Sequence, residues 1–255
     1  MKMSRPSPAL LVGVAAAAGV VLVGGGFLFW KRRQEMLRRA LNAVDDANAE
    51  DPRPDVLQEG EEEEAVGGRF GGRERPKEWL YGRRMSRCLA KFAPGCSHVV
   101  QVAARAQHIR RWVSERKDFP EGRAGYLQWR QALGRMHGRL SEEIMLASGY
   151  GQREASRAVT LLTKKDLKAD AEVQLLEDVI CLVFLQYYWK PFQEKHTGPE
   201  SGISGKKGED KQLGEEKLIH IVKQTWEKMS DKGRKEALKL DFEPRAKELI
   251  LKALT

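Results

Sequence analysis

Apolar residues recur at intervals of three and four through most of this chain of 255 residues, and no alternation of apolar and polar residues persists beyond a few positions. This spacing aligns apolar side chains along one face of an α-helix, whereas a half-buried strand requires alternation. We therefore expect an all-α fold, arranged as a helical bundle. The expected helices are 33–48, 77–92, 97–115, 122–148, 152–163, 171–195, 215–229, 231–238 and 243–254.

The N-terminal segment 9–30 contains 22 residues and no charge. A helix of this length, rising about 1.5 Å per residue, spans the roughly 30 Å hydrocarbon core of a membrane. The run ends at Trp30 without a small-residue cleavage site, which favours a single-pass transmembrane helix that is not cleaved. More Lys and Arg residues follow the span than precede it, so we expect the C-terminal domain in the cytosol. Such an anchor also suits an organelle outer membrane.

Beyond this anchor, assigned to residues 1–32, the remaining residues 33–255 are enough for one all-helical domain. The segments 58–72 and 197–214 are rich in Gly and charged residues, and we expect both to be flexible insertions. The net charge of +9 fits either a phosphate-bearing partner or an ordinary solvated basic surface. No specific nucleic-acid motif is present, and the sequence does not indicate an oligomeric state.

Several polar residues interrupt the apolar pattern and are candidates for an internal site. His137 falls on the apolar face of its predicted helix, and Asp178 stands at the entrance of an apolar run, where a carboxylate needs a partner. Arg110 and Arg111 would bind a phosphate or carboxylate, or else form an exposed pair or a salt bridge to Asp178. On a predicted turn, Lys164 and Lys165 are further phosphate-binding candidates, with a solvated turn as the alternative.

Four sequence strings carry a resemblance to a known family. They are QHIRRW from Gln107, GYLQWRQAL from Gly125, LEDVICLVFLQYY from Leu176 and KQTWEKMS from Lys223. In this order they resemble the family catalogued as domain of unknown function 4202, from about Ala40 to the C-terminus. The resemblance implies an all-helical fold and brings no established activity.

The order of two His residues and an Asp is also similar to metal-dependent phosphohydrolases of the HD superfamily. This resemblance implies an HD-like bundle in which His108, His137 and Asp178 bind a divalent metal ion that activates water. The chain departs from that pattern, because Ile109 stands where the Asp of the His-Asp pair belongs. The predicted helix 77–92 also lacks a His, so Glu142 or Glu177 would have to substitute as ligands.

Two hypotheses follow. In the first, a membrane-anchored helical domain has a polar site built from His108, Arg111, His137 and Asp178 and acts as a metal-dependent phosphohydrolase on a phosphate-bearing small molecule. In the second, the domain is a non-catalytic ligand-binding or scaffolding module at a membrane. Histidines hydrogen-bonded to carboxylates in the core, or acting on phosphate without a metal, are the alternatives to metal ligands. Convergence of the two histidines and Asp178 within about 5 Å of one point would favour a metal site.

Overall fold

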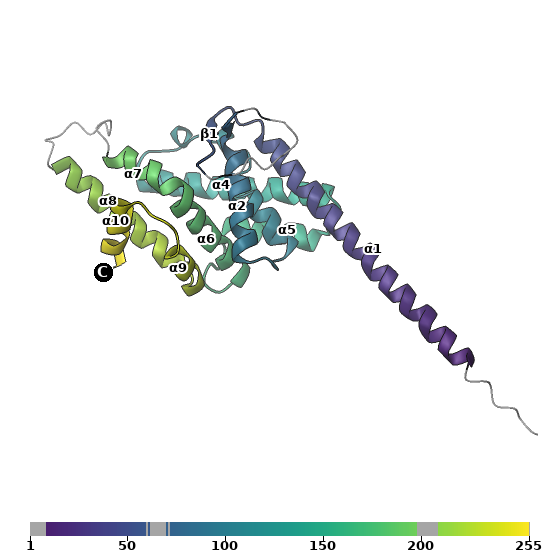
Figure 1. Ribbon diagram of the computed structural model, residues 1–255. Helices are drawn as coiled ribbons and strands as arrows, with labels where there is room; N and C mark the ends of the chain where they lie inside the picture. Colours follow the sequence, from purple (N-terminus) through teal and green to yellow (C-terminus); the bar gives the residue numbers. More distant parts are fainter. Residues whose placement is uncertain (1–8, 60, 62–69, 71, 198–208, 255) are drawn as a thin grey trace, which may run out of the picture.

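The computed structural model describes residues 9–59, 61, 70, 72–197 and 209–254, with the side chains of 26–59, 61, 70, 72–194, 214–244 and 246–252. The described chain is mostly helical, which confirms the all-α prediction (Figure 1). The α-helices are α1 (Ala9–Asn48), α2 (Lys77–Phe92), α3 (His98–Arg105), α4 (Gly122–Ala147), α5 (Gln152–Thr163), α6 (Ala171–Val183), α7 (Trp189–Thr197), α8 (Glu209–Lys228), α9 (Asp231–Ala237) and α10 (Pro244–Leu254).

Shorter elements connect these helices. Two 3₁₀ turns, Arg111–Val113 and Arg116–Asp118, lie between α3 and α4, and a π-helix, Phe184–Tyr188, joins α6 to α7. The strands β1 (Pro54–Val56) and β2 (Glu74–Pro76) form an antiparallel pair. The sequence did not predict this pair, because three residues are too few to establish an alternating pattern.

Side-chain caps explain where several helices begin. Ser97 accepts a hydrogen bond from the backbone N–H of Val100 at the start of α3, and Asp170 caps α6 in the same way. Ser230 caps α9 by accepting from the backbone N–H of Gly233. Ser and Asp are favoured at this position because their oxygens satisfy N–H groups that have no partner within the helix.

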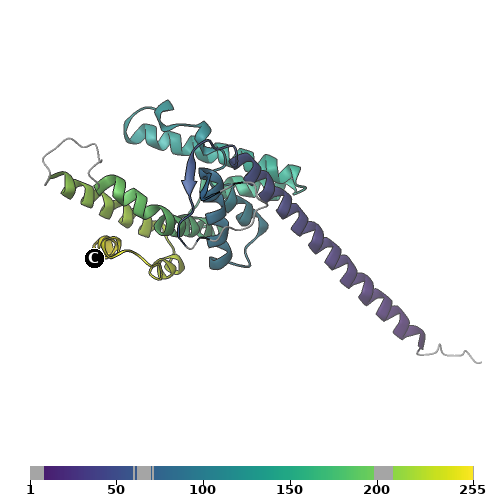
Figure 2. The same ribbon diagram turned by 45° about the horizontal axis from the view of Figure 1, so that its top comes forward.

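The two larger apolar clusters hold most of the described helices together. The larger surrounds α2, α3, α5 and α6, and includes the fully buried Met85 and Val179. The smaller joins α7, α8 and α10 around Trp189 and Leu218. Figures 1 and 2 show α8 running beside α7, so that the C-terminal helices form one side of the body.

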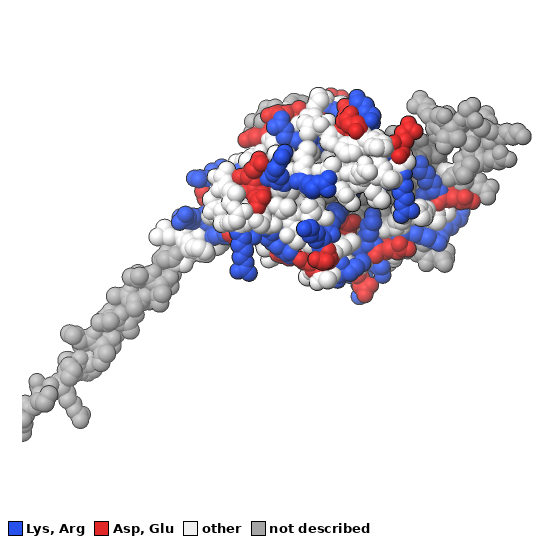
Figure 3. Space-filling view, turned by 180° about the vertical axis from the view of Figure 1, so that it is seen from behind, with Lys and Arg blue, Asp and Glu red and all other residues white. Residues whose placement is uncertain are grey.

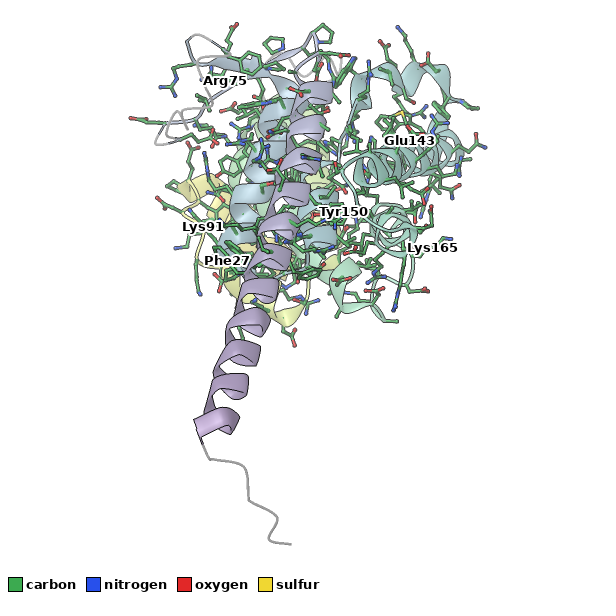
Figure 4. The ribbon with its side chains drawn as sticks, turned by 90° about the vertical axis from the view of Figure 1, so that its right-hand side faces the viewer. Phe27, Arg75, Lys91, Glu143, Tyr150 and Lys165 are labelled. Atoms are coloured by element: carbon green, nitrogen blue, oxygen red, sulfur yellow. The ribbon has the colours of Figure 1, made fainter. Side chains whose placement is uncertain are left out.

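The N-terminal helix α1 extends away from the body as one long helix (Figure 1). The middle of α1 is fixed by Arg33, whose guanidinium donates two hydrogen bonds to Glu154 at 2.7 and 3.0 Å and lies over the ring of Tyr150. Tyr150 lies beside α1 in Figure 4. Most of the predicted span 9–30 lies outside the described side chains. Within the part that is described, no helix combines the length and apolar character needed to cross a bilayer.

Arg84 joins β1 to the helical body. Its side chain is 1% exposed and donates hydrogen bonds to Asp55, Glu61 and the hydroxyl of Tyr188. A buried guanidinium is stable only when carboxylates and other acceptors surround it. This cluster therefore positions β1 and Glu61 against α2 and the π-helix.

The predicted helices differ most from the structure in three places. The helix expected at 97–115 ends at Arg105, and Arg110 then adopts a left-handed conformation with φ of 50°. The backbone N–H of Arg110 donates to Asn48, which fixes this turn. The helix expected at 171–195 is interrupted by the π-helix. Helix α8 begins at Glu209, before the start expected at residue 215.

Candidate functional site

A cleft of about 950 Å³ opens between the N-terminus of α2, the segment that follows α3, and the helices α4, α6 and α8. Its walls carry aromatic rings and an excess of cationic side chains. Among the lining aromatic residues are Tyr81, Trp112, Tyr126 and Trp129. Lys and Arg residues number seven among the lining residues, against three Glu residues. The cleft therefore combines flat apolar surface with net positive charge.

His108 lies in the wall of this cleft and is held on both sides of its ring. Nδ1 lies 3.0 Å from Oε2 of Glu78, and Nε2 lies 3.0 Å from a terminal nitrogen of Arg111. Because a guanidinium can only donate, Nε2 accepts, and the proton of the neutral ring is on Nδ1 and is donated to Glu78. Burial lowers the pKa of His108 well below its usual range, and the nearby Arg111 acts in the same direction.

Glu78 is the carboxylate that orients His108. Its side chain is 3% exposed, and it also accepts a hydrogen bond from Arg53 at 2.9 Å. Tyr81, one turn further along α2, stacks on the His108 ring with 4.0 Å between centroids. Burial raises the pKa of Glu78, while Arg111 and Arg53 oppose that shift. The first turn of α2 therefore fixes the imidazole in one plane and one tautomer.

Arg111 is fixed by two groups and faces the cleft. In addition to its bond with His108, its guanidinium lies 4.9 Å from the ring centre of Trp129, a cation–π distance. The indole N–H of Trp129 donates to the carbonyl of Ser114, which holds the ring in place. Arg111 forms no ion pair with a carboxylate within the described residues. Burial lowers the pKa of Arg111.

His137 lies behind His108, with ring centres 6.1 Å apart. It is 4% exposed, and its Nε2 has no hydrogen-bond partner among the described residues. Burial lowers its pKa well below the usual range. The structure therefore brings the two predicted histidines together, both neutral.

Asp178 does not join them. Its Oδ1 accepts from the backbone N–H of Ser230 at 2.7 Å, and its Oδ2 accepts from the Ser230 hydroxyl. Glu177, the preceding residue, lies on the cleft side instead and pairs with Lys164 at 2.6 Å. Successive helical residues point about 100° apart, which explains the separation of these neighbouring carboxylates.

The expected metal ligands therefore do not form a ligand group. Within the part of the chain that the structure describes, no three His, Cys, Asp or Glu residues are placed to hold a metal ion. Both ring nitrogens of His108 are already engaged by Glu78 and Arg111. These side chains do not fit a divalent metal ion, and the metal cofactor remains a prediction from the sequence.

The predicted phosphate-binding residues divide into two groups. Arg111 and Lys164 line the cleft, and Lys165 lies beside it on an adjoining cavity. Arg110 is directed elsewhere and pairs with Glu50 at 2.7 Å. Its left-handed backbone turns the two successive arginines to different sides.

Sequence reasoning missed Glu78, Trp129 and Arg130 as members of this site. Glu78 occupies the first turn of a helix, where an acidic residue is ordinarily a favourable partner of the helix dipole. Its contact with His108 spans 30 residues of sequence and has no local signal. Trp129 lies within the string GYLQWRQAL, at the spacing of the apolar face of its helix, which indicates a core residue rather than a site residue.

A family model described as domain of unknown function (DUF4202) matches residues 38–250. The match covers most of the chain, and the chain belongs to this family. No curated protein and no solved structure matches the chain. The comparisons do not show the predicted resemblance to HD phosphohydrolases.

Proposed function

We propose that the cleft around His108 and Arg111 binds a small molecule that carries a phosphate group and a planar ring. The observation that carries this proposal is the fixed position of Arg111 between His108 and Trp129 without a carboxylate partner among the described residues. A guanidinium held in this way has lost its conformational freedom before a ligand arrives, so binding costs less entropy. Its planar fork matches phosphate oxygens, which it contacts through two parallel N–H groups.

The rest of the cleft supports the same ligand class. Arg130 and Lys77 line it as exposed cations, and neither forms an ion pair with a described residue. The rings of Tyr126 and Trp112 offer flat surfaces on which a planar group can stack. This reading agrees with the second hypothesis from the sequence, a ligand-binding module, and requires no metal ion.

Binding of AMP, ATP and inorganic phosphate to the full chain in detergent, measured by isothermal titration calorimetry, tests the proposal. We expect Arg111→Gln to weaken AMP binding by about tenfold or more, as for the loss of a charge-assisted hydrogen-bond pair. Arg110→Gln is the matched control, because this neighbouring arginine pairs with Glu50 outside the cleft. Failure of all three probes to bind, or equal losses in the two variants, would contradict the proposal.

We also propose that residues 9–30 anchor the chain in a membrane, with the C-terminal domain in the cytosol. The charge-free run and the basic residues that follow it support this. The last residues of the run, Phe27 to Trp30, are apolar and more than half exposed on α1. In Figure 3 this apolar end is drawn white next to the grey part of α1, with Lys and Arg side chains beside it on the body.

Extraction of cell membranes with alkaline carbonate tests the anchor. The full chain should remain in the membrane pellet, and Val14→Arg combined with Ala18→Arg should release it, because charges at the centre of a span oppose insertion. Protease treatment of sealed vesicles then determines which side the domain occupies. Release of the unchanged chain by carbonate would overturn the anchor, and protection of the C-terminal domain inside vesicles derived from the cell interior would overturn the orientation.

A further inference from the structure

A second cavity of about 560 Å³ is lined by α4, α5 and the segment that follows α3, and it includes His108 in its wall. Five cationic residues line it, and no Asp or Glu is among its lining residues. The cationic residues are Arg111, Arg130, Arg135, Lys164 and Lys165. Cations in one concave wall repel each other, so such a cavity is stabilised by an anion.

Most of these cations have no ionic partner in the described structure. Arg130, Arg135 and Lys165 form no ion pair, and only Lys164 has a carboxylate, Glu177, which lines the larger cleft. Lys164 and Lys165 follow the end of α5 at Thr163, and the left-handed conformation of Lys164, with φ of 54°, turns the chain back there. The excess positive charge is therefore available to a ligand.

Two buried polar side chains of this cavity also lack partners among the described residues. His137 is 4% exposed and Gln107 is 5% exposed, and the unpaired atoms are His137 Nε2 and Gln107 Oε1. A buried polar atom without a hydrogen bond destabilises the fold unless a ligand or water completes it. Nε2 of His137 would donate to an anion in the Nε2–H tautomer.

The cavity and the cleft adjoin each other and share part of their walls. Gln107, His108, Arg111, Arg130 and Lys164 line both. Arg111 therefore lies at the junction, with aromatic rings on one side and a wall free of carboxylates on the other. A ligand that reaches across the junction would place its ring and its negative charge in different compartments.

We propose that the ligand carries a chain of two or more phosphates, whose distal phosphates occupy the cavity between α4 and α5 while the ring stacks in the aromatic cleft. The chemical class is a nucleoside oligophosphate or a similar ring-bearing oligophosphate. This inference rests on the proposed function and extends it from one phosphate to a phosphate chain. Each terminal phosphate contributes about 1.5 to 2 negative charges, which several cations are needed to neutralise.

Titration of the full chain in detergent with AMP, ATP and inorganic triphosphate tests the inference. ATP should bind more tightly than AMP by about tenfold or more, since additional charge-assisted contacts form with the distal phosphates. Arg135→Gln and Lys165→Gln should each weaken ATP and triphosphate binding by about threefold to tenfold, and should change AMP binding by less than about twofold. Both residues are exposed, so neither substitution should prevent folding.

Arg139→Gln is the matched control. Arg139 is exposed on α4 one turn after Arg135 and does not line the cavity. The phosphate-chain inference is overturned if ATP and AMP bind equally, or if Arg139→Gln weakens ATP binding as much as Arg135→Gln does. The proposed function is still supported in either case if AMP binding depends on Arg111. Triphosphate binding as tight as ATP binding would overturn the role of the ring.

Discussion

Asp178 accepts hydrogen bonds from both the backbone N–H and the hydroxyl of Ser230, which lies 52 residues later in the chain. Ser230 in turn caps α9. The side chain is so close to α9 that a Cβ atom on Gly233 would lie 2.6 Å from Asp178 Oδ1. This buried carboxylate therefore attaches the C-terminal helices to α6.

Asp178→Asn should destabilise the chain and leave ligand binding unchanged. An amide offers one acceptor where the two Ser230 donors need two, and the cost of a buried unsatisfied donor is about 1–3 kcal/mol. For a domain of this size that corresponds to a fall in the melting temperature of several degrees, roughly 2–4 °C per kcal/mol. Differential scanning fluorimetry measures the melting temperature. Asp231→Asn is the control, because the Asp231 side chain is exposed. An unchanged melting temperature together with weaker AMP binding would assign Asp178 to the ligand site instead.

The sequence correctly indicated that Asp178 needs a partner, because a carboxylate beside an apolar run cannot be left unpaired. It did not identify the partner, because helical periodicity does not determine which of two neighbouring residues faces a given side of the helix. Glu177 faces Lys164 and the cleft, and Asp178 faces Ser230. The cap that Ser230 places on α9 is by contrast a local contact, with the backbone N–H of Gly233 three residues later.

The stability of the domain should fall as the pH is lowered through the usual pKa of histidine. Burial lowers the pKa of His137 in the folded state, so below about pH 6.5 the unfolded chain binds a proton that the folded chain does not. The loss amounts to at most about 1.4 kcal/mol per pH unit for one such histidine. His137→Leu should therefore show a smaller difference in melting temperature between pH 7.5 and pH 5.5.

His108 adds to this loss, and Glu78 acts against it, because burial raises the pKa of that carboxyl and favours proton uptake by the folded state. The comparison between the wild type and His137→Leu isolates one histidine from these other groups. His220, on α8 outside the cleft, supplies the control substitution His220→Leu. The same pH dependence in wild type and His137→Leu would show that His137 titrates normally.

Glu78→Gln should tighten the binding of AMP. The substitution removes a buried negative charge that interacts with Arg111, and keeps an oxygen that can accept from Nδ1 of His108. With an effective dielectric constant near 20, the removed repulsion between Glu78 and the ligand phosphate corresponds to about threefold to tenfold in affinity. Glu78→Ala removes the acceptor as well and should weaken binding, because His108 no longer holds Arg111 in place. Calorimetric titration of both variants with AMP tests this prediction. If both substitutions change the affinity for AMP in the same direction, His108 does not hold Arg111 in place.

Sequence pattern predicted the fold best where helix contacts are local and regular. The bounds of α2 and α5 agree with the prediction at both ends. The pattern failed after α3. Ile109 continues the helical spacing of apolar residues, but it lies in a turn rather than a helix and is buried beside Val44 of α1. A tertiary contact with α1 replaces the helical hydrogen bonds there, and local periodicity does not contain that information.

Arg84→Met should be the most destabilising single substitution among those considered. It would leave Glu61, which is 5% exposed, and Asp55 without their principal buried cation. Removing one partner of a buried ion pair costs about 3–5 kcal/mol. Arg87→Met is the matched control, since Arg87 lies one turn further along α2 and contacts Glu61 at only 3.5 Å. Adding Glu61→Leu to Arg84→Met should restore part of the lost melting temperature, because the stranded carboxylate is the main source of the loss. No recovery in this double variant would mean that Arg84 stabilises the fold chiefly through Tyr188 and the π-helix.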